Sequence, residues 1–475
     1  MTNLFALFLI ILYTYTILST ISVLLLENRN PVKSISWVLV LLFLPLLGMI
    51  LYLYFGQDYR KKKIISKKSI RKVIDRPFIP IENNNIDLSI FTSNQLNLIK
   101  LLNRNSDASG YCNNKIDVFS SGNESFESLF DEIKKAKDHI HLQFFIFDDD
   151  RISNQLRELL ISKTKEGIRV RMIFDYWGSF KLSKKYIQSL RDAGIYARAF
   201  LPFRWKISRS SKINYRNHRK LVVIDGEIGF IGGLNVADRY IYGNKLGNWR
   251  DTFVRMEGAA VHGLQLLFMI DWYFVDRKFI DGPEYFPKPK IFGPNMVQLV
   301  SSGPDTDWES IMQGIASAII SATKYVYIHT PYFMPTDVIS NCIEIAVLSG
   351  IDVRLMIPVK SDSPLSTAST ITYLGNVLDA GGKVYLYQRG FLHSKAIVID
   401  DFISIVGSAN FDERSFNQNF EANAFIYDAP TAQKLKQLYL EDIEHCVELN
   451  LNDWNNRKRS QKLKESFARL FSPLM

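Results

Sequence analysis

The chain is poor in cysteine, and its cysteines are scattered. Cys112, Cys342 and Cys446 are the only three, and none belongs to a C-x-x-C pair. This argues against a disulfide framework or a zinc site, and it fits a reducing compartment. Charged residues make up only 22% of the 475 residues and hydrophobic residues 47%, which suits two or three globular domains with an added apolar segment.

Most of the chain also lacks a strong net charge. The total is +10, but Asp58 to Lys72 accounts for +7, so the remainder carries only about +3. A nucleic-acid-binding protein would spread positive charge over its folded surface. We therefore expect no nucleic-acid partner. Because the basic run follows an apolar segment, it points to a membrane surface instead.

The N-terminal region has two long runs without charge. Leu4 to Leu26 is 23 residues long, enough to cross a hydrocarbon core of about 30 Å. Ile35 to Phe55 is the second run, and Pro45 and Gly48 leave a re-entrant segment there as an alternative. The simplest prediction is a hairpin of two transmembrane helices over residues 1–57. Its ends would be cytoplasmic, since a basic juxtamembrane linker follows over residues 58–105.

An eight-residue motif occurs twice in the rest of the chain. The pattern H-x-K-x-x-x-x-D spans His218–Asp225 and returns 175 residues later at His393–Asp400. Each copy has an asparagine 17 residues beyond its histidine, at Asn235 and Asn410. One copy could arise by chance, but two copies with matching flanks indicate an internal duplication. A duplication can bring two histidines and two lysines into one site.

The residues around the motifs alternate between strand and helix patterns. Residues 139–147 and 170–174 read as buried strands of the first half, and 325–330 and 353–357 take the corresponding places in the second. Alternation of this kind predicts an α/β fold. We expect one repeat over residues 106–280 and another over 290–450.

The duplicated motif, read with the residues around it, resembles the phospholipase D superfamily, and the whole chain resembles bacterial cardiolipin synthases. The similarity extends beyond the two motifs to the apolar N-terminus and to several short segments: Asn217, Trp249-Arg250-Asp251, Thr330-Pro331-Tyr332-Phe333, Arg414-Ser415 and Leu470-Phe471-Ser472-Pro473-Leu474. The resemblance implies two homologous α/β/α repeats packed with pseudo-two-fold symmetry. It also implies a multi-pass enzyme of the bacterial cell membrane, with its catalytic part in the cytoplasm.

Phosphodiester chemistry explains why the residues come in pairs. One histidine can attack phosphorus and form a phosphohistidine, while the other protonates the departing alcohol and then deprotonates the incoming one. Lys220 and Lys395 would offer positive charge to phosphate oxygens, with Asn235 and Asn410 as neutral donors. Side chains alternate along a strand, so each lysine points to the same side as the histidine two residues before it. Such a site needs neither a metal nor a cofactor.

Each histidine should also have an acidic partner that fixes its tautomer. The resemblance assigns Glu421 to His393, 28 residues before it, and suggests Asp251 as the counterpart for His218, at a spacing of 33. Asp225 and Asp400 belong to the catalytic motif, but we expect them to support the site through hydrogen bonds. By analogy with the superfamily, His218 is the expected nucleophile and His393 the acid and base.

The resemblance implies that one phosphatidylglycerol donates its phosphatidyl group to a second, giving cardiolipin and glycerol. Three alternatives remain open at this point. Water could be the acceptor, which would make the enzyme a phosphodiester hydrolase. Phosphatidylethanolamine could be the donor. The protein could also be an inactive membrane scaffold, although the intact H, K, D and N positions in both copies speak against that.

The C-terminal segment, residues 451–475, is basic and amphipathic. Leu463, Phe467, Leu470 and Phe471 fall on one helical face. The segment is either a helix packed on the folded domain or an interfacial helix that dips into lipid.

Overall fold

The computed structural model describes residues 88–202 and 214–472 throughout, with residues 65 and 67–76. In the N-terminal region it describes residues 7, 10–11, 13–15, 17–18, 21–22, 31–44, 47–48 and 51–52. The chain divides into two compact units. The first comprises residues 1–62 and 203–215, and the second comprises residues 63–202 and 216–475.

In the first unit, helix α2 spans Pro31–Phe43. Leu41 and Tyr52 are buried, and the rings of Trp37 and Tyr52 meet edge to face with centroids 5.4 Å apart. Among the residues that the structure describes, no helix has both the length and the apolar character needed to cross a bilayer. The two predicted transmembrane runs lie largely outside the described residues.

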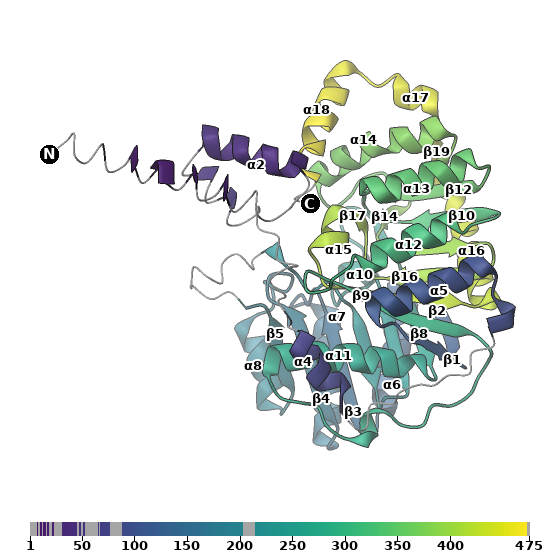
Figure 1. Ribbon diagram of the computed structural model, residues 1–475. Coiled ribbons are helices and arrows are strands. Elements are labelled where there is room, and N and C mark those ends of the chain that lie inside the picture. Colours follow the sequence, from purple (N-terminus) through teal and green to yellow (C-terminus); the bar gives the residue numbers. More distant parts are fainter. Residues whose placement is uncertain are drawn as a thin grey trace. The chain divides into compact units, whose positions relative to one another are not determined.

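The second unit contains two mixed sheets with helices packed against them (Figure 1). The eight-stranded sheet has the order β14-β8-β7-β6-β3-β4-β5, and β2 also pairs with β8. Its strands are β2 (Lys115–Ser121), β3 (His139–Phe144), β4 (Arg169–Asp175), β5 (Tyr196–Phe200), β6 (Leu221–Ile224), β7 (Ile228–Gly232), β8 (Asn248–Glu257) and β14 (Gly390–Leu392). The main helices of this half are α6 (Gly122–Lys135), α7 (Arg151–Lys165), α8 (Lys184–Asp192), α10 (Arg239–Tyr242) and α11 (Ala260–Asp276).

The nine-stranded sheet has the order β1-β9-β18-β16-β15-β10-β12-β13-β19. Its strands are β1 (Gly110–Cys112), β9 (Met296–Ser302), β10 (Tyr325–His329), β12 (Asp352–Pro358), β13 (Lys383–Tyr387), β15 (Ala396–Ile399), β16 (Ile403–Gly407), β18 (Glu421–Tyr427) and β19 (Cys446–Leu449). The pair β11 (Phe333–Met334) and β17 (Phe411–Asp412) lies beside it. The helices of this half are α12 (Ser310–Ile320), α13 (Asp337–Leu348), α14 (Pro364–Ala380), α15 (Glu413–Asn417), α16 (Ala429–Ile443), α17 (Leu451–Asn455) and α18 (Arg459–Arg469).

The predicted duplication appears as a repeated sheet topology. The order β8-β7-β6-β3-β4-β5 of the first half corresponds to β18-β16-β15-β10-β12-β13 of the second. In each half three strands run parallel, and the strand after the motif histidine pairs antiparallel with the first of them. The predicted α/β fold with two repeats is therefore confirmed. The expected strands at 139–147, 170–174, 325–330 and 353–357 correspond to β3, β4, β10 and β12.

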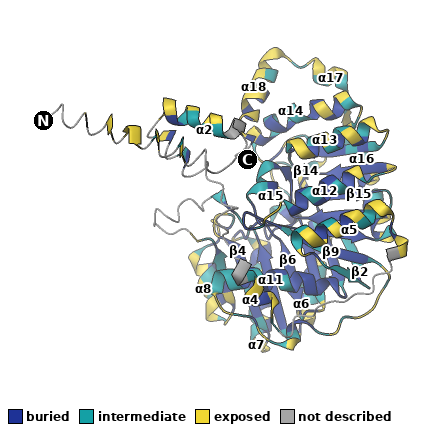
Figure 2. Ribbon diagram, viewed as in Figure 1, coloured by how far each residue is buried: buried dark blue, intermediate teal, exposed yellow. Residues whose placement is uncertain are grey.

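Each half has its own hydrophobic core. Buried side chains line both sheets, while the outer faces of the covering helices are exposed (Figure 2). The short strands β1 and β14 are exchanged between the halves. β1 precedes the first repeat but pairs with β9 of the second, and β14 belongs to the second repeat but pairs in parallel with β8 of the first.

Two helices lie where the sequence predicted only a linker. Helix α4 (Lys67–Ile74) packs against α11 of the first repeat. Helix α5 (Ser93–Ser106) buries Leu98, Ile99 and Leu102 in the core of the second half. The basic charges concealed the first helix, and the second has the amphipathic spacing of a helix with a Thr92 N-cap.

Candidate active site

Two equivalent backbone contacts bring the motif histidines to the junction of the two halves. The backbone N–H of His218 donates to the carbonyl of Phe420 (2.9 Å), and that of His393 donates to the carbonyl of Arg250 (2.7 Å). Phe420 immediately precedes Glu421, and Arg250 immediately precedes Asp251. Each histidine is therefore placed beside a carboxylate of the other repeat.

The histidine–carboxylate pairing predicted from sequence is wrong in its partners. His218 Nδ1 lies 2.9 Å from Glu421 Oε1, and His393 Nδ1 lies 2.6 Å from Asp251 Oδ2. Both pairs cross between the repeats, whereas the sequence spacing suggested a pairing inside each one. The physical reason is strand exchange: Leu392 of β14 is in register with Arg250 of β8, so the next residue along each strand is His393 or Asp251.

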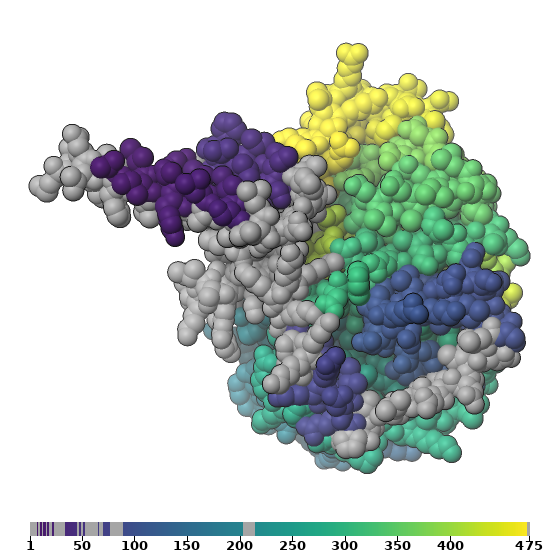
Figure 3. Space-filling view, viewed as in Figure 1, coloured from purple at the N-terminus to yellow at the C-terminus, as the bar shows by residue number. Residues whose placement is uncertain are grey.

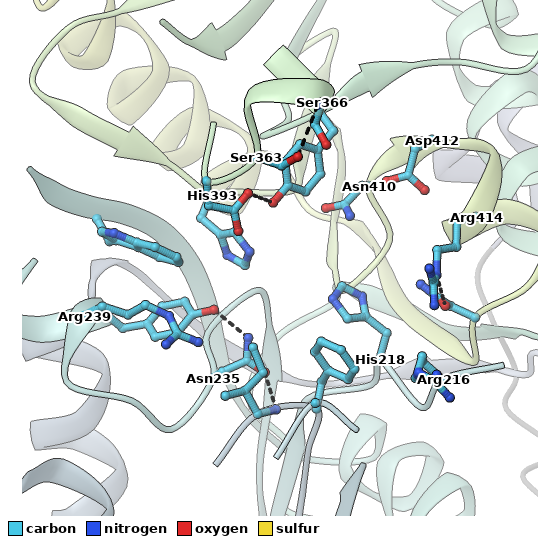
Figure 4. Close-up of a pocket in the computed structure, with 18 of the residues that line it drawn as sticks. Arg216, His218, Asn235, Arg239, Ser363, Ser366, His393, Asn410, Asp412 and Arg414 are labelled. Carbon is cyan, nitrogen blue, oxygen red and sulfur yellow. Dashed lines mark hydrogen bonds between the residues drawn. The ribbon is translucent and has the colours of Figure 1, made fainter. Parts of the chain in front are cut away.

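Burial sets the protonation of both imidazoles. It lowers the pKa of His218 to about 4 and that of His393 well below its usual range. A neutral imidazole whose Nδ1–H donates to a carboxylate has an unprotonated Nε2. Both side chains line the same pocket, and Figure 4 shows the two rings facing one space. The geometry thus presents two basic ring nitrogens to one ligand.

The two carboxylates differ in their surroundings. Burial raises the pKa of Asp251 to about 7. Burial would also raise the pKa of Glu421, but His218 and Lys220 hold it below its ordinary value, and the Ser408 hydroxyl donates to it as well. The first repeat has Gly233 at the place of Ser408, where an added Cβ would lie 2.1 Å from Asp251 Oδ1. No hydroxyl can therefore reach Asp251 from that position.

The motif lysines lie behind the histidines. Lys220 Nζ donates to the carbonyl of His218 (2.6 Å), and Lys395 Nζ donates to the carbonyl of His393. Lys395 Nζ is also 3.0 Å from His393 Nδ1. Burial lowers the pKa of Lys395 to about 8 and that of Lys220 further below its usual range. Their charge thus depends on Glu421 and Asp251 or on an anion in the pocket.

The two motif asparagines line the pocket, as their spacing suggested. Asn235 accepts from the backbone N–H of Ile146 (3.0 Å) and donates to the Tyr240 hydroxyl (2.6 Å). The side-chain oxygen of Asn410 is buried without a hydrogen-bond partner. These contacts fix the amide of Asn235, and they leave the Asn410 oxygen able to accept a hydrogen bond from a ligand.

Asp225 and Asp400 lie away from the reacting groups. The Asp225 carboxylate accepts from the backbone N–H groups of Lys137, Asp138 and His139 at the beginning of β3. Asp400 does the same for residues 323–325 at the beginning of β10. Because the pocket borders the far ends of these strands, both aspartates fix sheet geometry. Their inclusion with the catalytic residues is corrected in this sense, while their expected role as hydrogen-bonding supports agrees with these contacts.

The pocket between the repeats has a volume of about 760 Å³. Sequence reasoning did not assign several of the side chains that line it. These include the cations Arg216, Arg239 and Arg414, the acids Asp362 and Asp412, and the aromatic residues Phe145, Trp177, Tyr240 and Trp249. Arg216 directly precedes the Asn217-His218 segment and Arg414 lies just beyond Asn410, so proximity to the motifs was the available signal. Three arginines around two histidines favour an anionic ligand with more than one phosphate.

Known proteins share this arrangement over most of the chain. The family described as "Cardiolipin synthase, PLD-like domain" matches residues 129–248 and 315–443, and "Phospholipase_D-nuclease N-terminal" matches residues 6–57. Cardiolipin synthase 2 of Bacillus anthracis is 40% identical over 460 residues, which cover 95% of this chain and 89% of that protein. Major cardiolipin synthase ClsA of Bacillus subtilis is 40% identical over 479 residues, covering 98% of each.

A solved structure supports the fold. Phosphatidylserine synthase of Haemophilus influenzae superposes with a TM-score of 0.62 at 15% identity, over 79% of this chain and all of that protein. Together with the matches to both repeats and the near full-length relatives, the crossed histidine pairs settle the family. The chain is an enzyme that belongs to the bacterial cardiolipin synthases of the phospholipase D superfamily.

Proposed function

We propose that the enzyme transfers a phosphatidyl group from one phosphatidylglycerol to another through a phosphohistidine, giving cardiolipin and glycerol. The observation that carries this proposal is the pair of neutral imidazoles in one pocket, each held through Nδ1 by a buried carboxylate. Two such groups suit a transfer in two steps, since one can carry the phosphatidyl group while the other handles the proton.

In the first step His218 is the nucleophile. Its Nε2 lone pair forms a bond to phosphorus as the bond from phosphorus to the glycerol oxygen breaks. Glu421 supports this role because its lowered pKa keeps it ionised, and an ionised carboxylate stabilises the positive charge that the ring acquires. The Ser408 hydroxyl, which donates to Glu421, helps to hold that charge state.

In the same step His393 is the general acid. Its Nε2 gives a proton to the departing glycerol oxygen, so glycerol leaves as a neutral alcohol. In the second step it takes the proton of an acceptor hydroxyl while that oxygen attacks phosphorus and the bond to His218 breaks. The raised pKa of Asp251 supports this assignment, because the Asp251–His393 pair can then hold an extra proton near neutral pH.

The cations of the pocket bind the phosphates. Lys220 and Lys395 supply charge from behind the histidines, and a bound phosphate favours their protonated forms. Arg216, Arg239 and Arg414 surround the opening, where the acceptor's own phosphate must lie while its hydroxyl attacks. Asn235 and Asn410 orient the transferred phosphate.

Residues 1–57 form a transmembrane hairpin in this proposal, followed by the basic segment 58–105. The catalytic repeats, 106–280 and 290–450, then lie in the cytoplasm beside the cell membrane, with residues 451–475 as the C-terminal segment. Two uncharged runs before a basic run support this topology, as does the match of residues 6–57 to an N-terminal family. Protease added to right-side-out and to inverted membrane vesicles tests it: the repeats should be cut only in the inverted ones.

The chemistry is tested with purified protein and phosphatidylglycerol vesicles without added metal. Mass spectrometry should find cardiolipin and glycerol with the wild type, and neither product with His218→Ala or His393→Ala. Phosphatidic acid without cardiolipin would mean that water is the acceptor. Labelled phosphate mapped to His393 instead of His218 would reverse the two roles.

A further inference from the structure

Helix α18 is amphipathic, but it packs with its polar side inward. Glu465 and Ala468 are buried against the second repeat, while Leu463, Phe467 and Leu470 are 72%, 62% and 70% exposed. The exposed three are spaced four and three residues apart, which places them on one face of the helix. A surface helix ordinarily buries its apolar face. The reversed orientation leaves a continuous apolar strip on the outside.

Specific polar contacts hold the helix in this orientation. Glu465 forms an ion pair with Arg457 at 3.1 Å and accepts from the Gln461 amide at 2.9 Å. At the other end of the helix, the Ser472 hydroxyl is 2.7 Å from the hydroxyl of Tyr373 on α14. A buried carboxylate is costly unless it is paired. The sequence therefore fixes Glu465 inward, and the apolar strip cannot turn toward the core without breaking these contacts.

The strip has a basic border. Lys458, Arg459, Lys462, Lys464 and Arg469 belong to or adjoin the helix, and its single acid, Glu465, is already paired. Figure 3 shows this C-terminal segment, in yellow, at the surface of the second repeat. An apolar strip bordered by cations is complementary to an anionic lipid surface. A second copy of the same helix would bring these like charges together, so charge disfavours a dimer through this face.

The strip lies close to the active-site pocket. Helix α18 packs on α14, and Ser363 and Ser366 at the beginning of α14 line the pocket. Tyr373, which contacts Ser472, follows Ser366 by seven residues, or about 10 Å along a helix. On the first repeat, Trp177 lines the same pocket and Phe180 in the turn after β4 is 74% exposed. Apolar side chains from both repeats therefore border the opening.

We propose that the strip formed by Leu463, Phe467 and Leu470 inserts into the surface of an anionic bilayer and turns the pocket toward the leaflet from which it takes lipid. This contact is separate from the proposed N-terminal hairpin, which would tether the folded repeats without orienting them. The orienting role rests on the proposed function, since it presumes a lipid substrate; the insertion itself does not.

The first test measures the depth of the strip directly. A full-length chain with its three cysteines replaced carries Phe467→Cys with an environment-sensitive fluorophore, in vesicles that contain phosphatidylglycerol and nitroxide-labelled lipid. The matched control is Leu348→Cys, because Leu348 is 74% exposed and apolar but lies just before β12, at the strand end opposite the pocket. We expect quenching at 467 and not at 348, with weaker quenching at high salt or in uncharged phosphatidylcholine vesicles.

Equal quenching at the two positions would overturn the proposal. So would a fluorophore at 467 that is shielded from both lipid and water, because the strip would then be covered by protein, either a second copy or another part of this chain. This readout does not depend on catalysis. Wild-type protein that makes no cardiolipin but is quenched at 467 would contradict the proposed function and leave the insertion standing.

The second test separates docking from folding and chemistry. The double substitution Phe467→Glu with Leu470→Glu should lower turnover of phosphatidylglycerol vesicles by about tenfold or more. It should leave turnover of a short-chain phosphatidylglycerol, dissolved as monomers, unchanged, and Leu348→Glu should affect neither substrate. A loss on monomers as well would mean that the strip is structural, and Phe467→Leu should restore vesicle turnover if insertion is the cause.

Discussion

At the scale of single residues, the two halves of the active site are built alike but charged differently. His218 is bonded to Glu421, which also accepts from a serine hydroxyl, and His393 is bonded to Asp251, which has a glycine at the equivalent place. One missing hydroxyl and one shorter carboxylate therefore separate the two sites. This difference makes one pair suited to hold positive charge and the other to hold a mobile proton.

The substitution Glu421→Gln tests the first of these roles. The amide retains the shape of the side chain but removes the charge that stabilises the His218 ring, and it can favour the wrong tautomer. We expect turnover to fall by roughly 10²–10⁴-fold with little loss of folded protein. Quantified cardiolipin formation, with circular dichroism as the folding control, checks this. Turnover within a few fold of the wild type would remove Glu421 from the mechanism.

The pH dependence of kcat/KM follows from the same groups. His218 must be unprotonated to attack, and its pKa is lowered to about 4, so activity should be lost only as the pH falls toward 4 rather than through 6.5. The Asp251–His393 pair must hold a proton, so activity should decline as the pH rises through about 7. Initial rates from pH 4 to 9 should give this bell shape. In Asp251→Asn the alkaline limb should move, and an unmoved limb would contradict the assignment.

Asp225 gives a residue-scale prediction of the opposite kind. Its carboxylate accepts from three backbone N–H groups at the beginning of β3, and its own φ is +54°. Asparagine tolerates that φ but loses one acceptor oxygen. Asp225→Asn should lower the free energy of unfolding by about 1–3 kcal/mol, with turnover per folded molecule nearly unchanged. Thermal unfolding and assays at low temperature check this. A stable variant without activity would return Asp225 to the chemistry.

The sequence predicted the reacting residues better than their partners. A duplicated motif names His218, His393 and the two asparagines, because spacing along a strand decides which way side chains point. It could not give the crossed carboxylate pairs, since these depend on how β14 is exchanged between sheets. The arginines of the pocket were missed for the same reason: they converge only when the repeats meet.

At the scale of elements, the contact between α14 and α17 depends on a glycine within a helix. An added Cβ at Gly375 would lie 2.4 Å from Trp454 Cη2, and the Trp454 indole donates to the carbonyl of Ile371 (3.1 Å). Helix propensity favours alanine over glycine by about 1 kcal/mol, so stabilisation would be the naive expectation. The indole must move to admit a methyl group, and this loosens the C-terminal helices.

We therefore expect Gly375→Ala to destabilise the protein by about 1–3 kcal/mol and to make residues 451–472 more sensitive to protease. Asp379→Ala, on the exposed side of the same helix, is the matched control and should be neutral or stabilising. Denaturant unfolding and limited proteolysis measure the two effects. A stabilised Gly375→Ala variant would show that the tryptophan is free to move.

Strand positions at this scale followed from hydrophobic runs, which identified β3, β4, β10 and β12 with small errors at their ends. The short strands β1 and β14 did not, because three residues carry no periodic pattern. Helix α5 was hidden in the same way. Its burial is decided by contacts with α12 and β9, about 200 residues further along the chain.

At the scale of the whole catalytic unit, the exchanged strands make the two repeats one folding unit. β1 completes the sheet of the second repeat, β14 completes that of the first, and both histidine pairs cross between them. The covalent connection between the repeats, by contrast, runs over the surface, where Ile291 is 80% exposed. Interface contacts should therefore hold the halves together without the connection.

A protease site inserted after Lys290 tests this. Cleavage of the folded enzyme should leave the two fragments together in size-exclusion chromatography and leave cardiolipin formation within a few fold of the uncut protein, because a nick removes no buried contact. Calorimetry of the uncut protein should show one cooperative transition for both repeats, which separate domains would not give. Uncut protein treated with the same protease but lacking the inserted site is the control. Fragments that separate, or activity that disappears on cutting, would mean that the surface connection holds the repeats in register and that the crossed pairs depend on it.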